Sequence, residues 1–577
     1  MPFFTIYKKK LTKVFLILIL RCFKSVEKFM PKEKEKQKKK PKNYYDVIII
    51  GGGISGLTSA ALFGRFGISS CVFEMNENTG GYLAGFDRKG FKFDTAIHWL
   101  NDCNRTGLVT KVFRIIGNDF PEAKTQKKIR RFVDEKSDYL MTNNPDLLKE
   151  ELINKIPEDK KGIKKFFSDA KRISKSFDNY INLGRSTETM NLYRKAIFGL
   201  KMLKFALPFI PHLKYTGSKG VIKGLNKYSG NKEFQNLFGS EPDLLSCLVP
   251  VAWAYSNNFQ KTPSGGSREY PFWLKKYAEK FGNEIFLKSK VTEVLVENNT
   301  VNGVNVLMNN ETVSVNCKYV IAACDAETLL NKMLPSDLVS EKKKENLSNA
   351  ELYSSAFTVS VALNCPAENL GFGEENIFFF NSKVNHEDLT GGDAYKSGLH
   401  ISAPSVKDKS LVPEGCGTLN LFIPAEIHNH NFWACEKDGE GNFIRTEKYR
   451  CLKKEFAEIL INRTAERFAP DLKKHILFYD AATPMTYLRY TGNKNGTMMG
   501  QKPSKENILK KTASYKTPVK NLLQSGHWAD LGGGVLIAVK SALNTTLMVL
   551  KKENKRKFKL LAGYIDGEKG IESINSK

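Results

Sequence analysis

The sequence predicts an α/β protein whose first part is a doubly wound, mainly parallel sheet. Three observations lead to this fold class: a β-branched run at residues 47–50, glycines at the spacing Gly51, Gly53, Gly56, and a second apolar run at residues 68–73 that ends in Glu74. Continuous apolar runs are typical of buried parallel strands. The small residues between the two runs indicate a helix, so the segment is a strand–turn–helix–strand unit with an acid at its end.

Each position of this unit has a physical role in holding a dinucleotide. Gly51 permits the tight turn, Gly53 lets the backbone approach a diphosphate, and Gly56 lets helix and strand pack closely. The helix that begins near Ser55 offers free amides and the positive end of its dipole to that diphosphate. Glu74 can accept hydrogen bonds from ribose hydroxyls, which favours FAD or NAD over NADP. The alternative, a glycine-rich loop without a ligand, would explain neither the strands nor the acid.

Composition limits the class of protein. A chain of 577 residues with 41% hydrophobic residues is expected to form two or more domains. The net charge is +28, and the first 43 residues, with fourteen Lys or Arg and three Glu, carry +11 of it. No nucleic-acid motif accompanies this charge, so no nucleic-acid partner is expected. Ten scattered cysteines without C-x-x-C spacing predict reduced thiols in a cytoplasmic protein. The isolated pair His428 and His430 does not predict a metal site.

The N-terminal tail leaves two interpretations open. Residues 11–20 contain the apolar run VFLILIL between basic flanks, which is too short to span a bilayer. In the first interpretation this run is a peripheral membrane anchor, and the lysines of residues 32–42 bind anionic lipid. In the second, the protein starts at Met30, and residues 1–29 are a mis-assigned extension.

Two segments after Glu74 resemble a known family. They have the patterns GG-x3-GF and FD-x2-IH, at Gly80-Gly81 with Gly85-Phe86 and at Phe93-Asp94 with Ile97-His98. In these segments the chain resembles the phytoene desaturase superfamily of FAD-dependent oxidoreductases, and within it the branch of carotenoid isomerase and all-trans-retinol 13,14-reductase (retinol saturase). Tyr82 is a departure, because related flavin amine oxidases place an Arg directly after the paired glycines. The role of that Arg at the flavin phosphate therefore does not transfer, and an amine-oxidase interpretation weakens.

Residues 262–323 are similar to the same superfamily in the order of their elements. A helix over residues 268–280 precedes a strand at 291–296, a hairpin turn at Asn302-Gly303 and a buried return strand at 319–323. The resemblance implies that the backbone of Val291 contacts the adenine of the cofactor.

A second glycine-rich helix start lies more than 400 residues after the first. A strand ends at residues 522–523, Gly526 opens a loop, and glycines 532–534 precede a helix from Val535 to about residue 550. Its amides add donors for the flavin, and the resemblance implies that this motif closes over it. FAD is therefore the predicted cofactor, and its predicted contacts are Gly51, Gly53, Ser55, Gly56, Glu74, Gly80, Gly81, Val291, Gly526, Gly533, Gly534 and Val535.

The predicted domains are interleaved along the chain, because an inserted α+β substrate domain separates the parts of a Rossmann-like FAD-binding domain. The expected boundaries are a basic tail at 1–43, FAD-binding parts at 44–130, 261–334 and 481–553, a mainly helical, membrane-facing region at 131–260, a mixed-sheet substrate domain at 335–480 and a C-terminal tail at 554–577. The apolar stretch 196–213 is expected to be either a membrane-dipping helix that draws substrate from the bilayer or a core helix.

The resemblance implies redox chemistry at a carbon–carbon bond of an apolar polyene or isoprenoid, by hydride transfer at flavin N5. Desaturation, saturation and isomerisation stay open, as do a quinone, NAD(P)H or oxygen as the electron partner. His98 is the predicted catalytic residue and His527 a second candidate, and the alternative is that both are structural. The rival functions are a flavin amine oxidase and a non-enzymatic binder of prenylated proteins or lipid with the same fold. Peripheral membrane association is expected.

Overall fold

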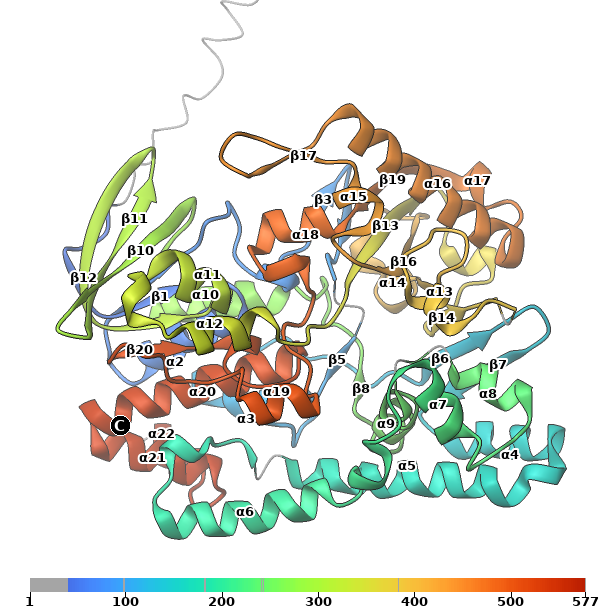
Figure 1. Cartoon of the computed structure of the whole chain (residues 1–577), viewed down its shortest axis with the longest axis horizontal. Coiled ribbons are helices and arrows are strands. Elements are labelled where there is room, and N and C mark those ends of the chain that lie inside the picture. The colour runs from blue at the N-terminus through green and yellow to red at the C-terminus, as the bar shows by residue number, and fades with distance from the viewer. Residues whose placement is uncertain are drawn as a thin grey trace, which may run out of the picture. The chain divides into compact units, whose positions relative to one another are not determined.

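The computed structural model describes residues 40–96, 99–180, 183–239, 241, 243–381 and 383–575, so the N-terminal apolar run and His98 lie outside the described residues. Its first sheet has the order β10-β11-β12-β1-β2-β9, and β20 also pairs with β12 (Figure 1). β1, β2, β9 and β20 run parallel to their neighbours, whereas β10, β11 and β12 form an antiparallel meander. The bounds are β1 (Tyr44–Ile50), β2 (Ser70–Phe73), β9 (Glu284–Phe286), β10 (Ser289–Glu297), β11 (Thr300–Met308), β12 (Glu311–Ala322) and β20 (Leu522–Gln524).

The predicted strand–turn–helix–strand unit stands at the centre of this sheet. Helix α2 (Ile54–Arg65) connects β1 to β2, and it packs against α10 (Glu269–Lys280) and α20 (Gly534–Glu553). Along β1, Val47 and Ile49 belong to the core on the α2 face, whereas Ile48 and Ile50 belong to the core on the opposite face. Burial on both faces explains why residues 47–50 of this strand are all apolar. The predicted fold class is confirmed.

One predicted turn is wrong. Asn302 and Gly303 lie inside β11, and the β10–β11 hairpin turns four residues earlier, at Asn298 and Asn299. Both asparagines have positive φ angles, 49° and 56°. Two consecutive left-handed residues are typical of the two-residue hairpin turn whose twist matches the strands, and Asn adopts this conformation readily. Gly303 instead faces close backbone, because a Cβ there would lie 2.4 Å from the carbonyl oxygen of Val315 on β12.

A second seven-stranded sheet has the order β19-β13-β16-β15-β14-β6-β7 and is antiparallel except where β14 pairs with β6. Its strands are β6 (Lys128–Val133), β7 (Asp138–Thr142), β13 (Ser355–Leu363), β14 (Asn376–Phe379), β15 (Leu399–Ser402), β16 (Gly417–Ala425) and β19 (Ile476–Ala482). One face packs against α16 (Glu447–Phe468). Phe378, His400 and Phe422 on the other face line a cavity. The domain boundaries expected from the sequence stay predictions.

A helical region lies beside β6 and β7. It consists of α4 (Pro145–Lys155), α5 (Lys160–Tyr180), α6 (Leu192–Ala206), α7 (Gly217–Leu225), α8 (Lys232–Gly239) and α9 (Leu244–Tyr255). Aromatic and aliphatic side chains of α4, α5 and α7–α9 share a core with the two strands. Helix α6 runs along the outer edge of the molecule (Figure 1), and none of its residues is buried. Within α6, which covers residues 196–206 of this stretch, the alternative of a core helix is therefore wrong.

Among the described residues, one helix has the length and composition of a membrane span, and it is α20. In the protein, 78% of its apolar window is buried, against α2, α3 (Leu108–Ile116) and α21 (Lys555–Ile565). The remaining elements are short connections, among them β3 (Phe86–Arg88), β4 (Phe91–Phe93), β5 (Leu100–Asn101), β8 (Phe259–Gln260), β17 (Glu436–Lys437), β18 (Phe443–Ile444), α11 (Ala326–Thr328), α12 (Glu341–Ser348), α13 (His386–Thr390), α14 (Pro404–Lys407), α15 (Asn429–Trp433), α17 (Leu472–His475), α18 (Pro484–Thr491), α19 (Lys505–Lys510) and α22 (Glu572–Asn575).

Candidate functional site

A cavity of about 2320 Å³ extends from the ends of the first sheet to the second sheet. This volume exceeds the roughly 300–1,000 Å³ of a pocket for one small ligand, so the cavity has room for a dinucleotide and a second molecule. Eleven of the twelve predicted cofactor residues line it: Gly51, Gly53, Ser55, Glu74, Gly80, Gly81, Val291, Gly526, Gly533, Gly534 and Val535. The twelfth, Gly56, lies beneath the first turn.

The first glycine turn is built as its spacing predicts. Gly51 has a φ of +101°, and its N–H donates to the carbonyl of Phe73 at the end of β2. A Cβ at Gly56 would lie 2.0 Å from the carbonyl oxygen of Gly51, so only glycine lets helix α2 approach the strand this closely. At Gly53 a Cβ would meet no protein atom within 4 Å, because this position borders the cavity. Backbone is therefore exposed where a diphosphate would lie.

Glu74 is held at the carboxyl end of β2 with its carboxylate beside the turn. Its side chain accepts hydrogen bonds from the Gly52 N–H at 2.6 Å and from the backbone and side-chain nitrogens of Asn76 at 2.9 and 2.8 Å. These bonds use three of the roughly four acceptor positions of a carboxylate, and Glu74 lines the cavity. Val291 lies two residues after Ser289 on β10, and the N–H of Ser289 donates to the Glu74 carbonyl at 2.8 Å.

The paired glycines Gly80 and Gly81 lie against the first turn. The Gly80 N–H donates to the Gly52 carbonyl at 2.8 Å, and the two glycines have φ angles of 122° and 57°. A Cβ at Gly81 would lie 3.4 Å from the Cα of Gly53. The two glycine segments therefore form one continuous stretch of bare backbone along the cavity wall.

Three serine hydroxyls connect the first and last parts of the chain. Ser55 at the start of α2 lies 2.7 Å from Ser525 Oγ and 3.2 Å from Ser541 Oγ on α20. Ser541 Oγ also accepts the N–H of Gly526 at 2.6 Å. Ser55 was predicted as a cofactor contact, and the structure shows that its hydroxyl also fixes the relative position of the two helix starts.

The second glycine motif closes the same site from the opposite side. Gly533 precedes α20, and a Cβ there would lie 2.4 Å from the Cβ of Met499. Gly534 has a φ of +83°, and a Cβ there would meet nothing within 4 Å. The N-termini of α2 and α20 therefore both present free amides and a positive dipole end to one cavity. Bare backbone, two helix starts and an acid at the end of β2 together fit the diphosphate and ribose of FAD.

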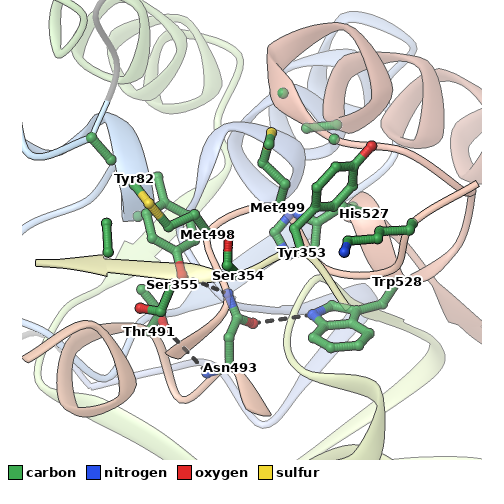
Figure 2. Close-up of a pocket in the computed structure, with 18 of the residues that line it drawn as sticks. Tyr82, Tyr353, Ser354, Ser355, Thr491, Asn493, Met498, Met499, His527 and Trp528 are labelled. Atoms are coloured by element: carbon green, nitrogen blue, oxygen red, sulfur yellow. Dashed lines mark hydrogen bonds between the residues drawn. The ribbon is translucent and has the colours of Figure 1, made fainter. Parts of the chain in front are cut away.

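Tyr82 belongs to a polar network between the paired glycines and the second motif (Figure 2). Its hydroxyl donates to the Thr497 carbonyl at 2.5 Å and receives the Asn493 side-chain amide at 3.3 Å. The Trp528 indole N–H donates to the side-chain oxygen of Asn493 at 3.1 Å. Burial raises the pKa of Tyr82 to about 12, so the phenol stays protonated. Asn493 and Trp528 were not predicted, and no local pattern in the sequence marks them as a pair.

His527, the second catalytic candidate, lines the cavity beside this network (Figure 2). Its ring centroid lies 6.5 Å from that of Tyr82. Desolvation lowers the pKa of His527 to about 4, so the imidazole is neutral at pH 7. It can therefore accept or donate one hydrogen bond without bringing a charge to the cavity.

The described half of the FD-x2-IH segment has a structural role. Asp94 is buried, and its Oδ1 accepts the backbone N–H and the hydroxyl of Ser267 at 2.9 and 2.7 Å. These bonds connect the segment after β4 to the turn before α10. Burial raises the pKa of Asp94, whereas the Ser267 bonds lower it.

Comparisons with known proteins agree with this geometry. The family model for the NAD(P)-binding Rossmann-like domain matches residues 49–116. Over 550 residues the chain is 24% identical to the Danio rerio protein named inactive all-trans-retinol 13,14-reductase, covering 89% of this chain and 88% of that protein. Over 476 residues it is 24% identical to the chloroplastic prolycopene isomerase of Daucus carota, covering 78% of this chain and 71% of that protein.

The solved structure of a putrescine oxidase with bound putrescine has the same fold, with a TM-score of 0.56 and 15% identity over 89% of this chain and all of that one. This likeness concerns the fold alone. The sequence relatives fit the phytoene desaturase-like superfamily of FAD oxidoreductases, which confirms the resemblance seen in the glycine segments. Together with the Rossmann-like match they support FAD as the cofactor.

Proposed function

We propose that this chain is an FAD-dependent oxidoreductase that acts on a carbon–carbon bond of an apolar polyene or isoprenoid. The observation that carries the proposal is the shared cavity, in which two glycine-rich helix starts face a wall of aromatic side chains. The relatives named for retinol and prolycopene support the substrate class. Because one of these relatives is named inactive, turnover itself is the property to measure.

The part of the cavity wall that the second sheet forms suits a flat, conjugated chain. Phe378 and Phe422 line it on either side of His400, at ring-centroid distances of 4.1 and 4.2 Å from that imidazole. Aromatic faces pack well against a polyene and exclude water from it. FAD, when bound, supplies hydride transfer at its N5. The residues of this chain would orient the polyene and exclude water from its reacting carbons. A strong base is not required, because a polyene has no acidic proton.

His98 stays the proposed catalytic residue. Replacement of His98 by Ala is expected to lower turnover while the FAD content is kept. His527→Ala is the comparison variant, since we expect His527 to have a structural role. Unchanged turnover in His98→Ala would remove this histidine from the mechanism.

Helix α6 supports a proposed peripheral contact with a membrane. Leu200 and Leu203 are 71% and 55% exposed, and Lys201 and Lys204 lie between and beside them. Apolar side chains flanked by lysines suit the surface of an anionic bilayer. The segment that follows α6 lines the cavity through Phe209, Ile210 and Leu213, so lipid-soluble substrate would enter there.

The first test is the absorption spectrum of the purified protein between about 300 and 550 nm, before and after denaturation. Flavin bands that become those of free FAD on denaturation support the proposal. Absence of flavin, even after incubation with excess FAD, would overturn the oxidoreductase proposal and favour the lipid-binding alternative.

The second test is an anaerobic assay with retinoids, carotenoids and other isoprenoids, followed by product analysis. A saturated, desaturated or isomerised product identifies the direction, and parallel reactions with a quinone, NAD(P)H or oxygen identify the electron partner. Release of hydrogen peroxide with amines, and no polyene turnover, would instead support a flavin amine oxidase.

A further inference from the structure

Three basic side chains line the part of the cavity that surrounds Glu74. Lys290 lies on β10, Lys332 on the π-helical turn Leu329–Met333, and Arg489 on α18. All three residues are exposed, and together they are called the basic cluster below. Because they come from three elements that are far apart in the sequence, no local motif marks them as a group.

Backbone contacts place the basic cluster beside Glu74. The N–H of the residue before Lys290 donates to the Glu74 carbonyl at 2.8 Å. The turn that carries Lys332 packs against β10. The side-chain nitrogen of Asn76 donates to the Glu74 carboxylate at 2.8 Å, and to the carbonyl of the residue after Arg489 at 2.8 Å. The three cations therefore surround the end of the cavity where the glycine turn and the acid lie.

The basic cluster has no acidic partner in the part of the chain that the structure describes. Arg489 instead lies over the ring of the next residue, with 4.7 Å between the guanidinium carbon and the ring centroid. Nearby lysines that do not line the cavity are paired with acids: Lys288 with Glu77 at 3.5 Å, and Lys494 with Glu327 at 2.7 Å. The charge of the basic cluster is thus available to a ligand in the cavity.

The walls around the basic cluster supply no other positive side chain. The glycine segments 51–56, 80–85 and 526–535 contain neither Lys nor Arg, and the acidic residues Glu74 and Asp325 line the same part of the cavity. Amides at a helix start hold an anion at short range, whereas attraction over longer distances requires net charge. Without the basic cluster, an anionic ligand would approach walls that carry only acidic side chains.

We infer that the basic cluster attracts the diphosphate of FAD and speeds its capture, which gives Lys290, Lys332 and Arg489 a role in cofactor binding. The inference deepens the proposed function and rests on it, because it takes FAD as the cofactor. Cations that line a cleft raise the local concentration of an anionic ligand, and salt weakens this steering. The amides of the two helix starts would then hold the diphosphate.

The test measures the association rate constant of FAD with the full-length apoprotein by stopped-flow fluorescence, at about 20 mM and about 300 mM salt. The decisive variant is Lys290→Gln/Lys332→Gln/Arg489→Gln. At low salt we expect its rate constant to be about tenfold below that of the unchanged protein, and most of this difference to be lost at high salt. Riboflavin has the same ring system without the diphosphate, so its rate constant should be equal for the two proteins.

Two further variants separate charge from other effects. Lys288→Gln is the matched control, because Lys288 is close in sequence to the cluster, does not line the cavity and is paired with Glu77. It should leave the FAD rate constant unchanged. The variant Lys290→Arg/Lys332→Arg/Arg489→Lys preserves all three charges, so it should keep both the rate constant and its salt dependence. Melting temperatures show whether each variant is folded.

If the triple glutamine variant does not fold, each single glutamine variant should still slow FAD about twofold at low salt. Equal FAD rate constants for folded glutamine variants and the unchanged protein would overturn this inference alone. An equal slowing of riboflavin would also overturn it, because the substitutions would then act through the shape of the cavity and not through charge. Failure of the unchanged protein to bind FAD at either salt concentration would overturn the proposed function and the inference with it.

Discussion

The two seven-stranded sheets border one cavity but build their parts of it from different material. The first sheet contributes backbone: Gly53, Gly81 and Gly534 leave bare amides at the ends of strands and the starts of helices. The second contributes side chains, such as Phe378, Phe422 and Arg130, which pairs with Glu241 from the segment before α9. The difference teaches that a diphosphate can be held by chain geometry, whereas a long apolar molecule must be matched by side-chain shape.

The largest effect should come from adding one carbon to the backbone-built part. Gly56→Ala would place a Cβ 2.0 Å from the Gly51 carbonyl oxygen, and we expect a loss of about 3 kcal/mol of stability together with the bound FAD. Gly53→Ala is the matched control for the fold, since its Cβ meets no protein atom. It should keep the melting temperature and weaken FAD binding. Full FAD content in Gly56→Ala would contradict the conclusion that the first sheet holds the cofactor through its backbone geometry.

A smaller effect is expected at Glu74, whose carboxylate lies beside the first glycine turn. Glu74→Gln keeps the size of the side chain and removes the charge, so the FAD dissociation constant should rise about tenfold, the value of a charge-assisted hydrogen bond. Glu77→Gln is the control, because it removes the charge of a carboxylate whose side chain is 71% exposed. Its ion pair with Lys288, at 3.5 Å between Oε2 and Nζ, lies at the surface. FAD titration of the apoprotein measures both. Equal constants for the two variants would contradict the assigned role of Glu74.

The pH dependence of stability tests the burial of His527, which lines the cavity. Its folded pKa, about 4, is below the ordinary value of 6.5 because of burial, so the unfolded chain binds the proton more tightly. Stability is therefore complete above pH 6.5 and declines as the pH falls toward 4. We expect this histidine to account for about 1–2 kcal/mol of loss between pH 7 and 5, allowing for water in the cavity. In urea unfolding, the His527→Gln variant should lose less stability between pH 7 and 5 than the unchanged protein. Identical pH profiles of the two proteins would contradict the role of His527.

The smallest effect should appear outside the cavity, on α6. Leu200→Asp/Leu203→Asp should reduce binding to anionic vesicles about fivefold, since two apolar contacts with the bilayer are replaced by charges. Stability should not change, because both residues are exposed. Leu147→Asp on α4, whose side chain is 59% exposed, is the control. Vesicle sedimentation measures the three proteins, and equal binding would remove α6 from the membrane contact.

The same contrast explains which parts could be predicted from the sequence. The glycine spacing from Gly51 to Gly56 and the acid at Glu74 lie within one short unit, so a local pattern was enough to predict both the fold class and the residues that line the cofactor end of the cavity. The hairpin turn was placed wrongly because it, too, was predicted from a local pattern, the Asn302-Gly303 pair. Asn-Gly is the stronger turn signal in general, but Asn298 and Asn299 adopt the left-handed conformation here.

The side-chain part could not be predicted, because its residues come from distant segments. Arg130 and Glu241 are 111 positions apart, and their contact depends on β6 pairing with β14 and on the placement of α9. Nothing in the residues around either one signals a partner. Tyr82, Asn493 and Trp528 come from three distant segments in the same way, and Asn493 forms the hydrogen bonds that connect the other two.

The serine contacts between Ser55, Ser525 and Ser541 have a consequence for the order of events during synthesis. The first helix start leaves the ribosome early, but its partner serines lie 470 and 486 positions later. A growing chain therefore carries half of a flavin site for most of its translation. Capture of FAD must wait until nearly the whole protein has emerged, and a premature stop codon anywhere before residue 521 would release a polypeptide that lacks the second half of that site.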